Sequence, residues 1–158
     1  MKQKHLDVYI EMCLSLATLS NCPRRKFGTL LLDPKRNLIL GTAYNGGPRG
    51  GGELCGGAVC LRDVEQIESG TRAERGCHHA EFNAICQAAR VGTAIDGAWI
   101  ITNGEPCEMC AKAIHHSGVV KVVVVGGGYS GINGLAYLQQ HGIEIALVAG
   151  PQDPRGAR

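Results

Sequence analysis

Four residues in the second half of the chain carry the side chains that metal-assisted hydrolysis needs. Cys107 and Cys110 follow Pro106 at the predicted start of a helix, where both thiols would share a face and the helix dipole favours the thiolate. His79 and Glu81 lie at the start of the preceding predicted helix. One imidazole and two thiolates leave the fourth zinc position open for water, and a non-ligating carboxylate can move the protons of that water. The set predicts a catalytic zinc site with Glu81 as the proton carrier.

Each assignment competes with a plainer interpretation. A Cys-x-x-Cys pair alone could equally be redox-active or merely buried. Residues two apart on an ideal helix point about 200° apart, so His79 and Glu81 can both approach a metal only where the chain is still entering the helix. His78 is the competing ligand. Only His79 gives the spacing His-x-Glu, which together with Pro-Cys-x-x-Cys is typical of zinc deaminases that attack C4 of cytosine or C6 of adenine.

Apolar periodicity indicates the elements that must position these residues. The second half alternates between helices and strands, which predicts an α/β fold with helices covering the sheet, and the apolar run 122–125 is typical of a central strand. The Gly-rich segment 44–77 is expected to be an irregular loop. We expect one domain over 1–150 and a tail over 151–158. The pattern predicts helices over 6–20, 79–91, 107–116 and 132–141, and strands over 27–32, 38–43, 98–102, 119–125 and 143–148.

The bulk composition excludes several classes of protein. The chain has 158 residues and a formal net charge of +2, without long runs of one sign and with only two Phe and one Trp, which argues against a nucleic-acid track. No segment is typical of a membrane span or a secretory leader, so we expect a cytoplasmic protein without a membrane partner. In that setting the eight cysteines are better explained by metal binding and burial than by disulfides.

Four sequence motifs resemble those of the deoxycytidylate (dCMP) deaminases within the cytidine deaminase superfamily. The resemblance extends from about Tyr9 to Val148, and the second motif separates this group from tRNA adenosine and free-nucleoside deaminases. It implies a three-layer α/β/α fold with a five-stranded mixed sheet. It also implies conversion of dCMP and water to dUMP and ammonia in pyrimidine deoxynucleotide metabolism, with attack of zinc-bound hydroxide on C4. The motifs are SNCPRRKFG (20–28), GTAYNGGPRG (41–50), CHHAEFNAI (77–85) and PCEMCAKAI (106–114).

The resemblance also implies a substrate site. Asn45 corresponds to the family's deoxyribose contact, although an Asn among glycines is equally typical of a tight turn. Tyr129 resembles the family's phosphate-contacting tyrosine, but Ser130 follows it where the family commonly has an acidic residue. A basic run after the first helix could supply cations to the phosphate, or could be a solvated surface. The expected substrate residues are Asn45, Arg24, Lys26, Ala80 and Tyr129.

Many members of the family are hexamers that dCTP activates and dTTP inhibits. The resemblance therefore implies a homo-oligomer with an effector site, and a nucleotide effector would bring Mg2+ with it. The residues that match the effector and subunit-interface positions are Gly46, Arg49 and Arg90. Arg90 has a plainer interpretation as a cation that complements a helix C-terminus.

The remaining cysteines divide into two groups. A subset of the family carries a structural zinc at positions that match Cys22, Cys55, Cys60 and Cys77, and four thiolates would form a closed tetrahedral site. The competing interpretation is a set of reduced, unpaired thiols. Cys13 and Cys86 fall on apolar helical faces and are assigned to the core.

Two other functions compete with dCMP deamination. One is deamination of another cytosine nucleotide or of tRNA adenosine. The other is a zinc-stabilised binding or scaffold protein without activity. Such a protein could keep the metal ligands yet dispense with the proton carrier, whereas Glu81 is present here.

Overall fold

The computed structural model describes residues 1–50, 59–71, 73, 75–127 and 131–150, which form five helices and five strands. The expected tail over 151–158 lies outside the described residues. The strands are β1 (Gly28–Asp33), β2 (Leu38–Tyr44), β3 (Trp99–Thr102), β4 (Lys121–Val125) and β5 (Glu144–Val148). The helices are α1 (Gln3–Ala17), α2 (Leu61–Val64), α3 (Ala80–Val91), α4 (Glu108–His116) and α5 (Leu135–Gln140).

The strands form one sheet in the order β2-β1-β3-β4-β5. Strand β1 pairs antiparallel with both β2 and β3, whereas β3, β4 and β5 are parallel, so the sheet is mixed. Residues 122–125 of β4 are buried, as a strand with apolar side chains on both faces requires. The expected α/β fold with a five-stranded mixed sheet is confirmed.

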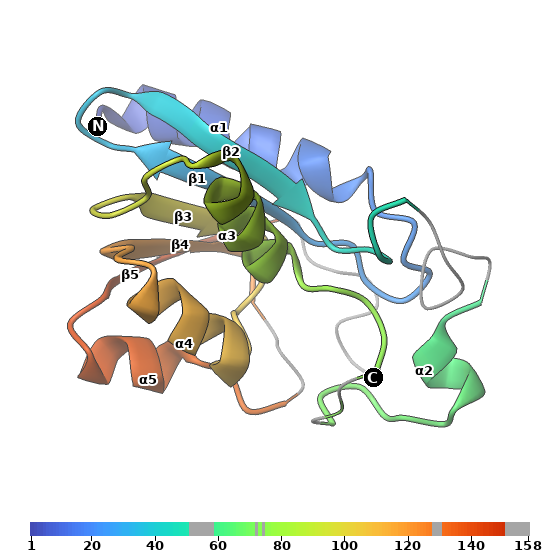
Figure 1. Ribbon diagram of the computed structural model, residues 1–158. Helices are drawn as coiled ribbons and strands as arrows, with labels where there is room; N and C mark the ends of the chain where they lie inside the picture. Colours follow the sequence, from blue (N-terminus) through green and yellow to red (C-terminus); the bar gives the residue numbers. More distant parts are fainter. Residues whose placement is uncertain (51–58, 72, 74, 128–130, 151–158) are drawn as a thin grey trace.

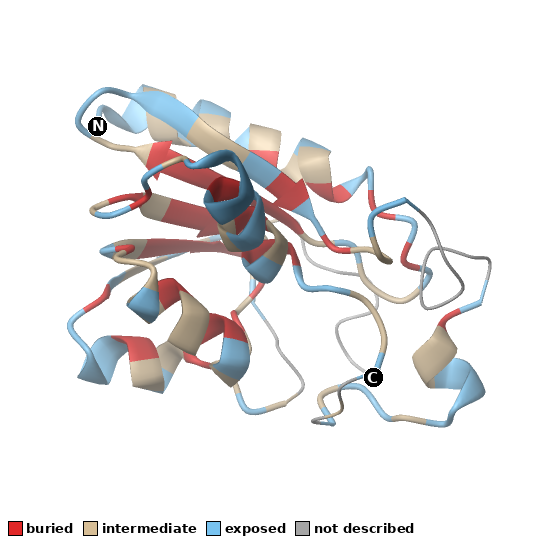
Figure 2. Ribbon diagram, in the orientation of Figure 1, coloured by how far each residue is buried: buried red, intermediate tan, exposed pale blue. Residues whose placement is uncertain are grey.

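The sheet lies between two helical layers (Figure 1). Each face of the sheet has its own hydrophobic core, and the side chains of β1 alternate between the two. Leu30 and Leu32 pack with α1, and Leu31 packs with the helices on the other face. Helix α1 covers the first face alone, while α3, α4 and α5 cover the second (Figure 1). Figure 2 shows the buried residues concentrated in the inner strands β1, β3 and β4 and on the helix surfaces that face the sheet.

Several element boundaries differ from the predictions. The segment expected to be irregular contains the short helix α2, and α5 is shorter than expected. Helix α4 begins at Glu108 with Cys107 as its N-cap, so Pro106 precedes the helix rather than forming its first residue. Among the described residues, none of the helices is both long and apolar enough to cross a membrane.

The assignment of Cys86 to the core was wrong. Cys13 is fully buried on the inner side of α1, but Cys86 is exposed. The buried stripe of α3 contains Ala84 and Ala88, which are four residues apart on one face. Cys86 lies between them, about 200° around the helix from Ala84, and therefore points to solvent.

Candidate active site

The N-termini of α3 and α4 bring the predicted catalytic residues together. His79 is the N-cap of α3 and has extended backbone angles, φ −72° and ψ 148°, whereas Glu81 is in the first helical turn. Because His79 precedes the helix, its side chain is not bound to the helical spacing that would turn it away from Glu81. Cys107 holds the equivalent N-cap position of α4, and Cys110 follows one turn later. His78 is exposed and pairs with Gly46 through its main chain.

Three potential metal ligands converge at this point. Nδ1 of His79 lies 3.4 Å from Sγ of Cys107 and 3.5 Å from Sγ of Cys110. Within the described residues, this is the one group of three or more His, Cys, Asp or Glu side chains with all ligand atoms inside 4.8 Å of one another. An imidazole nitrogen and two thiol sulfurs are ligands that Zn2+ prefers, and three protein ligands leave a position for water. The donor set therefore fits a catalytic zinc ion.

The two thiols have different electrostatic environments. Hydrogen bonds from Cys110 and then His79 lower the pKa of Cys107 to about 4, despite partial burial. The pKa of Cys110 is raised because Cys110 is the donor in that pair and is buried. The hydrogen bond to Cys107 raises the pKa of His79, while the nearby positive charge of Arg62 acts in the opposite direction. Cys107 is therefore the thiol that loses its proton more easily, and metal binding would release the proton of Cys110 as well.

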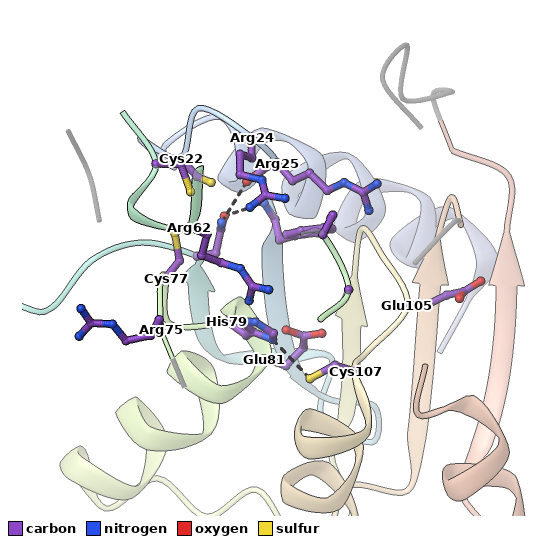
Figure 3. Close-up of a pocket in the computed structure, with 15 residues that line it drawn as sticks. Cys22, Arg24, Arg25, Arg62, Arg75, Cys77, His79, Glu81, Glu105 and Cys107 are labelled. Atoms are coloured by element: carbon purple, nitrogen blue, oxygen red, sulfur yellow. Dashed lines mark hydrogen bonds between the residues drawn. The ribbon is translucent and has the colours of Figure 1, made fainter. Parts of the chain in front are cut away.

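Glu81 has the environment of a proton carrier. Its side chain is only 6% exposed and lines the same pocket as His79 and Cys107 (Figure 3). Burial raises its pKa, and the charge of His79 partly offsets this effect. A carboxyl group whose pKa is raised toward neutrality can both accept and return a proton.

The Gly-rich motif lies directly beside this site. Asn45 is buried and lines the pocket; its Oδ1 accepts from the main-chain N of Phe27 at 2.8 Å, and its Nδ2 donates to the main-chain O of Arg25 at 3.0 Å. Gly46 exchanges two main-chain hydrogen bonds with His78, of 3.2 and 2.8 Å. These contacts fix the end of β2 against the segment that carries His79, the candidate metal ligand.

Three of the four cysteines predicted to bind a structural metal line the same pocket. Cys22 and Cys60 are buried, and Cys77 is partly buried. A hydrogen bond from Cys77 lowers the pKa of Cys22 to about 5, so one thiolate is already favoured there. Cys55 lies outside the described residues.

Arginines form the other polar part of the pocket. Arg24 and Arg25 line it, as the basic run suggested, whereas Lys26 is exposed and is not among the lining residues. The sequence interpretation missed Arg62 and Arg75, which line the pocket from the segment around α2. Both lie in a segment predicted to be irregular, where no spacing or periodicity indicated that they would face the pocket.

Glu105 was also missed. It lines the pocket two residues before Cys107, and its Oε2 accepts a hydrogen bond from Nδ2 of Asn133 at 2.9 Å. Its place directly before the Pro-Cys pair was the available signal. Of the other predicted residues, Ala80 is fully buried, Arg49 and Arg90 are exposed, and Tyr129 lies outside the described residues.

Comparisons with known proteins agree with this site. The sequence profile of the cytidine and deoxycytidylate deaminase zinc-binding region matches residues 3–126. The chain is 33% identical over 134 residues to deoxycytidylate deaminase of Enterobacteria phage T4, covering 66% of this chain and 68% of the relative. It is 31% identical over 125 residues to the deoxycytidylate deaminase of Mycobacterium phage D29, covering 74% and 91%.

A solved structure is similar over almost the whole fold. The dCMP deaminase of cyanophage S-TIM5, crystallised in complex with dCMP and dUMP, has a TM-score of 0.78 and 29% sequence identity. The match covers 94% of this chain and 99% of the cyanophage chain. These similarities confirm the resemblance that the sequence motifs indicated.

Proposed function

The chain belongs to the cytidine and deoxycytidylate deaminase family, and from this premise we propose that it hydrolyses dCMP to dUMP and ammonia. The observation that carries the proposal is the convergence of His79, Cys107 and Cys110 beside the buried Glu81. The named activities of the phage relatives, and the dCMP and dUMP bound in the cyanophage structure, support the choice of substrate.

The residues of the site divide the chemistry between them. His79, Cys107 and Cys110 would hold zinc, which supplies a positive charge that acidifies a water molecule. Glu81 would accept one proton of this water as its oxygen attacks C4 of cytosine, and would pass that proton to the ring nitrogen beside C4. It would then take the second proton from the new hydroxyl group on C4 and pass it to the amino group, so that the C4–N bond breaks, ammonia leaves and a C4 carbonyl remains. Burial of Glu81 suits this double role because a raised pKa makes the protonated form accessible.

The remaining parts of the substrate would occupy the rest of the pocket. Asn45 is placed to contact the deoxyribose, since it lines the pocket and the main chain fixes its amide orientation. Arg24 lines the pocket on the side of the basic run, where a phosphate group would find a cation. Further contacts to the substrate would come from Lys26, Ala80 and Tyr129.

A second, structural zinc is part of the proposal. Cys22, Cys60 and Cys77 line one pocket, and the Cys22–Cys77 hydrogen bond supports a shared metal site. With Cys55 as the fourth ligand, the metal would connect the segment after α1, the α2 segment and the residues that lead to His79. A structural zinc ion would thereby hold the long segment between β2 and α3 in place.

The family resemblance extends the proposal to regulation. We propose a hexameric, cytoplasmic enzyme of pyrimidine deoxynucleotide metabolism that dCTP with Mg2+ activates and dTTP inhibits. Gly46, Arg49 and Arg90 would contribute to the effector site and subunit contacts. The exposure of both arginines leaves them accessible to a nucleotide or a neighbouring subunit.

A substrate panel tests the proposed reaction. Ammonia release is measured with dCMP, CMP, deoxycytidine, dCTP and an adenosine-containing tRNA anticodon stem, with and without added dCTP, dTTP and Mg2+. We expect the highest kcat/KM with dCMP. A protein that binds zinc but releases ammonia from none of these compounds would contradict the proposed function and favour a scaffold role.

A further inference from the structure

Arg62 occupies an unusual place in the pocket. It belongs to α2, the short helix absent from the predicted pattern, yet it lines the same pocket as His79 and Glu81. In Figure 3 its guanidinium group points from the α2 segment toward the His79 ring. The effect of its charge on the pKa of His79 agrees with that placement. Arg62 is thus a cation beside the reaction centre but outside every motif named from the sequence.

Two neighbouring arginines of the pocket each have a carboxylate partner. Arg24 lies 3.3 Å from Oδ1 of Asp63, and Arg75 forms an ion pair with Glu65. Arg62 instead donates from Nη2 to the main-chain oxygens of Glu68 and Thr71, at 3.0 and 2.8 Å. These partners are neutral, so the positive charge of Arg62 is not compensated by them. Its Nη1 and Nε atoms have no hydrogen-bond partner among the described residues.

The backbone around Arg62 is built to hold its side chain. Gly76 has φ +110°, and a Cβ atom at this position would lie 2.9 Å from Cδ and 3.0 Å from Cγ of Arg62. Only glycine therefore permits the Arg62 side chain to pass so close to the main chain. Gly76 directly precedes Cys77 and lies three residues before His79. The Arg62 side chain is therefore held at two points, at Nη2 by two carbonyl oxygens and at Cγ and Cδ by its close approach to Gly76.

A fixed guanidinium group that has no carboxylate partner in the described part of the chain suits a dianion. A phosphate monoester carries a charge of about −1.5 to −2 at neutral pH, and arginine can bind two of its oxygens at once. We propose that Arg62 binds the 5′-phosphate of the substrate and is the residue that makes the site select a nucleotide over the corresponding nucleoside. This inference rests on the proposed function and adds a specificity-determining residue to it.

Kinetics on a matched substrate pair test this assignment. Initial rates are measured with dCMP and with deoxycytidine for the intact protein, for Arg62→Gln and Arg62→Lys, and for Arg36→Gln as a control. Arg36 is exposed in the turn between β1 and β2, so its substitution removes the same charge far from the pocket. Zinc content and circular dichroism show whether each variant is folded.

We expect Arg62→Gln to raise KM for dCMP by about 10- to 100-fold with little change in kcat, because one charge-assisted contact is lost. Its kcat/KM for deoxycytidine should stay within about twofold of the intact protein, since the nucleoside has no phosphate to lose. Arg62→Lys should lie between these values, and Arg36→Gln should match the intact protein. If deoxycytidine turns over too slowly, the inhibition constants of dUMP and deoxyuridine provide the same comparison.

Three outcomes would overturn the inference. Equal losses on dCMP and deoxycytidine would assign Arg62 a purely structural role around α2. An unchanged KM for dCMP would show that the phosphate lies elsewhere. If Arg62→Gln loses its zinc and does not fold, Arg62→Lys takes its place in the test. Equal affinities of Arg62→Lys and the intact protein for dUMP would then exclude a bidentate contact. By contrast, an intact protein that deaminates deoxycytidine but not dCMP would overturn the proposed substrate itself.

Discussion

At the scale of single residues, the site depends on a change of backbone conformation between two neighbouring functional positions. His79 is extended and Glu81 is helical, with Ala80 as the first residue of α3. This break lets the proposed metal ligand and the proposed proton carrier, only two residues apart, face the same pocket. It also places the His79 side chain at the exposed rim of the pocket and the Glu81 side chain in its buried part.

The role of Glu81 leads to a first prediction. Glu81→Gln should lower kcat for dCMP by about 10²- to 10⁴-fold, because an amide of the same shape cannot carry the proton. Zinc content should stay unchanged, since Glu81 is not among the converging ligands. Both are measured on the same preparation, by ammonia release and by elemental analysis.

The matched control for this variant is Glu11→Gln, which removes an exposed carboxylate from α1 on the opposite face of the sheet. It should retain full activity. Near-normal turnover in Glu81→Gln would show that another group moves the protons.

At the scale of elements, close packing between helices determines where the cysteine ligands lie. The buried surfaces of α3 and α4 are rich in alanine, with Ala84, Ala88 and Ala111 in one core cluster. Such small side chains let the helices approach the sheet closely. Gly134, the N-cap of α5, lies against Ala111 and the main chain of Cys107.

A second prediction follows from that contact. Gly134→Ala would place a Cβ atom onto the Cβ of Ala111 and 3.0 Å from the main-chain O of Cys107. The variant should lose about 1–3 kcal/mol of unfolding free energy through overpacking, and should bind zinc more weakly because Cys107 is displaced. Urea unfolding and zinc competition with a chelator measure the two effects.

The control is Gly41→Ala in β2, where the added atom would meet only Cδ1 of Leu31 at 3.7 Å. Its unfolding free energy should change by no more than about 0.5 kcal/mol. Equal stability and zinc affinity in Gly134→Ala and the intact protein would mean that α4 and α5 can separate freely.

The contact between α4 and α5 also predicts a pH dependence. Nδ1 of His115 lies 3.0 Å from the hydroxyl of Tyr137, and the rings of His115 and His141 stack with centroids 4.5 Å apart. Partial burial and then the charges of His141 and His116 lower the pKa of His115. The unfolded chain therefore binds more protons than the folded one as pH falls below about 6.5. The contribution of neutral His115 to the free energy of unfolding is therefore complete above pH 6.5. It is lost as the pH falls from 6.5 through the lowered pKa of His115.

Thermal unfolding at pH values from 8 to 5 measures this effect. His141→Gln removes one of the repelling charges, so its Tm should fall less steeply below pH 6.5 than that of the intact protein. His5→Gln, an exposed change on α1, should leave the slope unchanged. Parallel curves for His141→Gln and the intact protein would contradict the proposed coupling.

At the scale of the whole molecule, one pocket joins the sheet, two helix N-termini and the segment around α2. Cys60 comes from that segment, whereas Cys22 follows α1 and Cys77 precedes α3. A metal shared by these thiols would tie parts far apart in the sequence. Arg24 adds a connection, through its ion pair with Asp63 and its hydrogen bond to the main-chain O of Ile67.

The metal content of the whole protein gives a further prediction. The intact protein should contain about two zinc ions per chain, and Cys60→Ser should contain about one, with His79, Cys107 and Cys110 retaining theirs. Elemental analysis after gel filtration measures both. Cys86→Ser is the control, because Cys86 is exposed on α3, and it should keep two. A single zinc ion in the intact protein would contradict the structural site.

The sequence predicted the regular parts of this molecule well, since apolar periodicity reports burial directly. Apolar runs marked every strand of the sheet, and residue type and spacing marked the converging ligands. Features that depend on side-chain direction or on irregular backbone were not accessible. Cys86 looked apolar and helical but lies on the wrong side of α3, while α2 and Arg62 lie in a segment without periodicity.

The pair of hydrogen bonds between Gly46 and His78 closes the chain between them into a loop whose ends are fixed to each other. Because closure entropy grows only slowly with loop length, such a loop can gain or lose residues at modest cost to stability. The sequence and length of this loop can therefore vary while His79 keeps its position beside the sheet. Because Arg62 lies in this segment, exchanging the residues around α2 between relatives should alter the selectivity for a phosphate group and leave His79 and Glu81 in place.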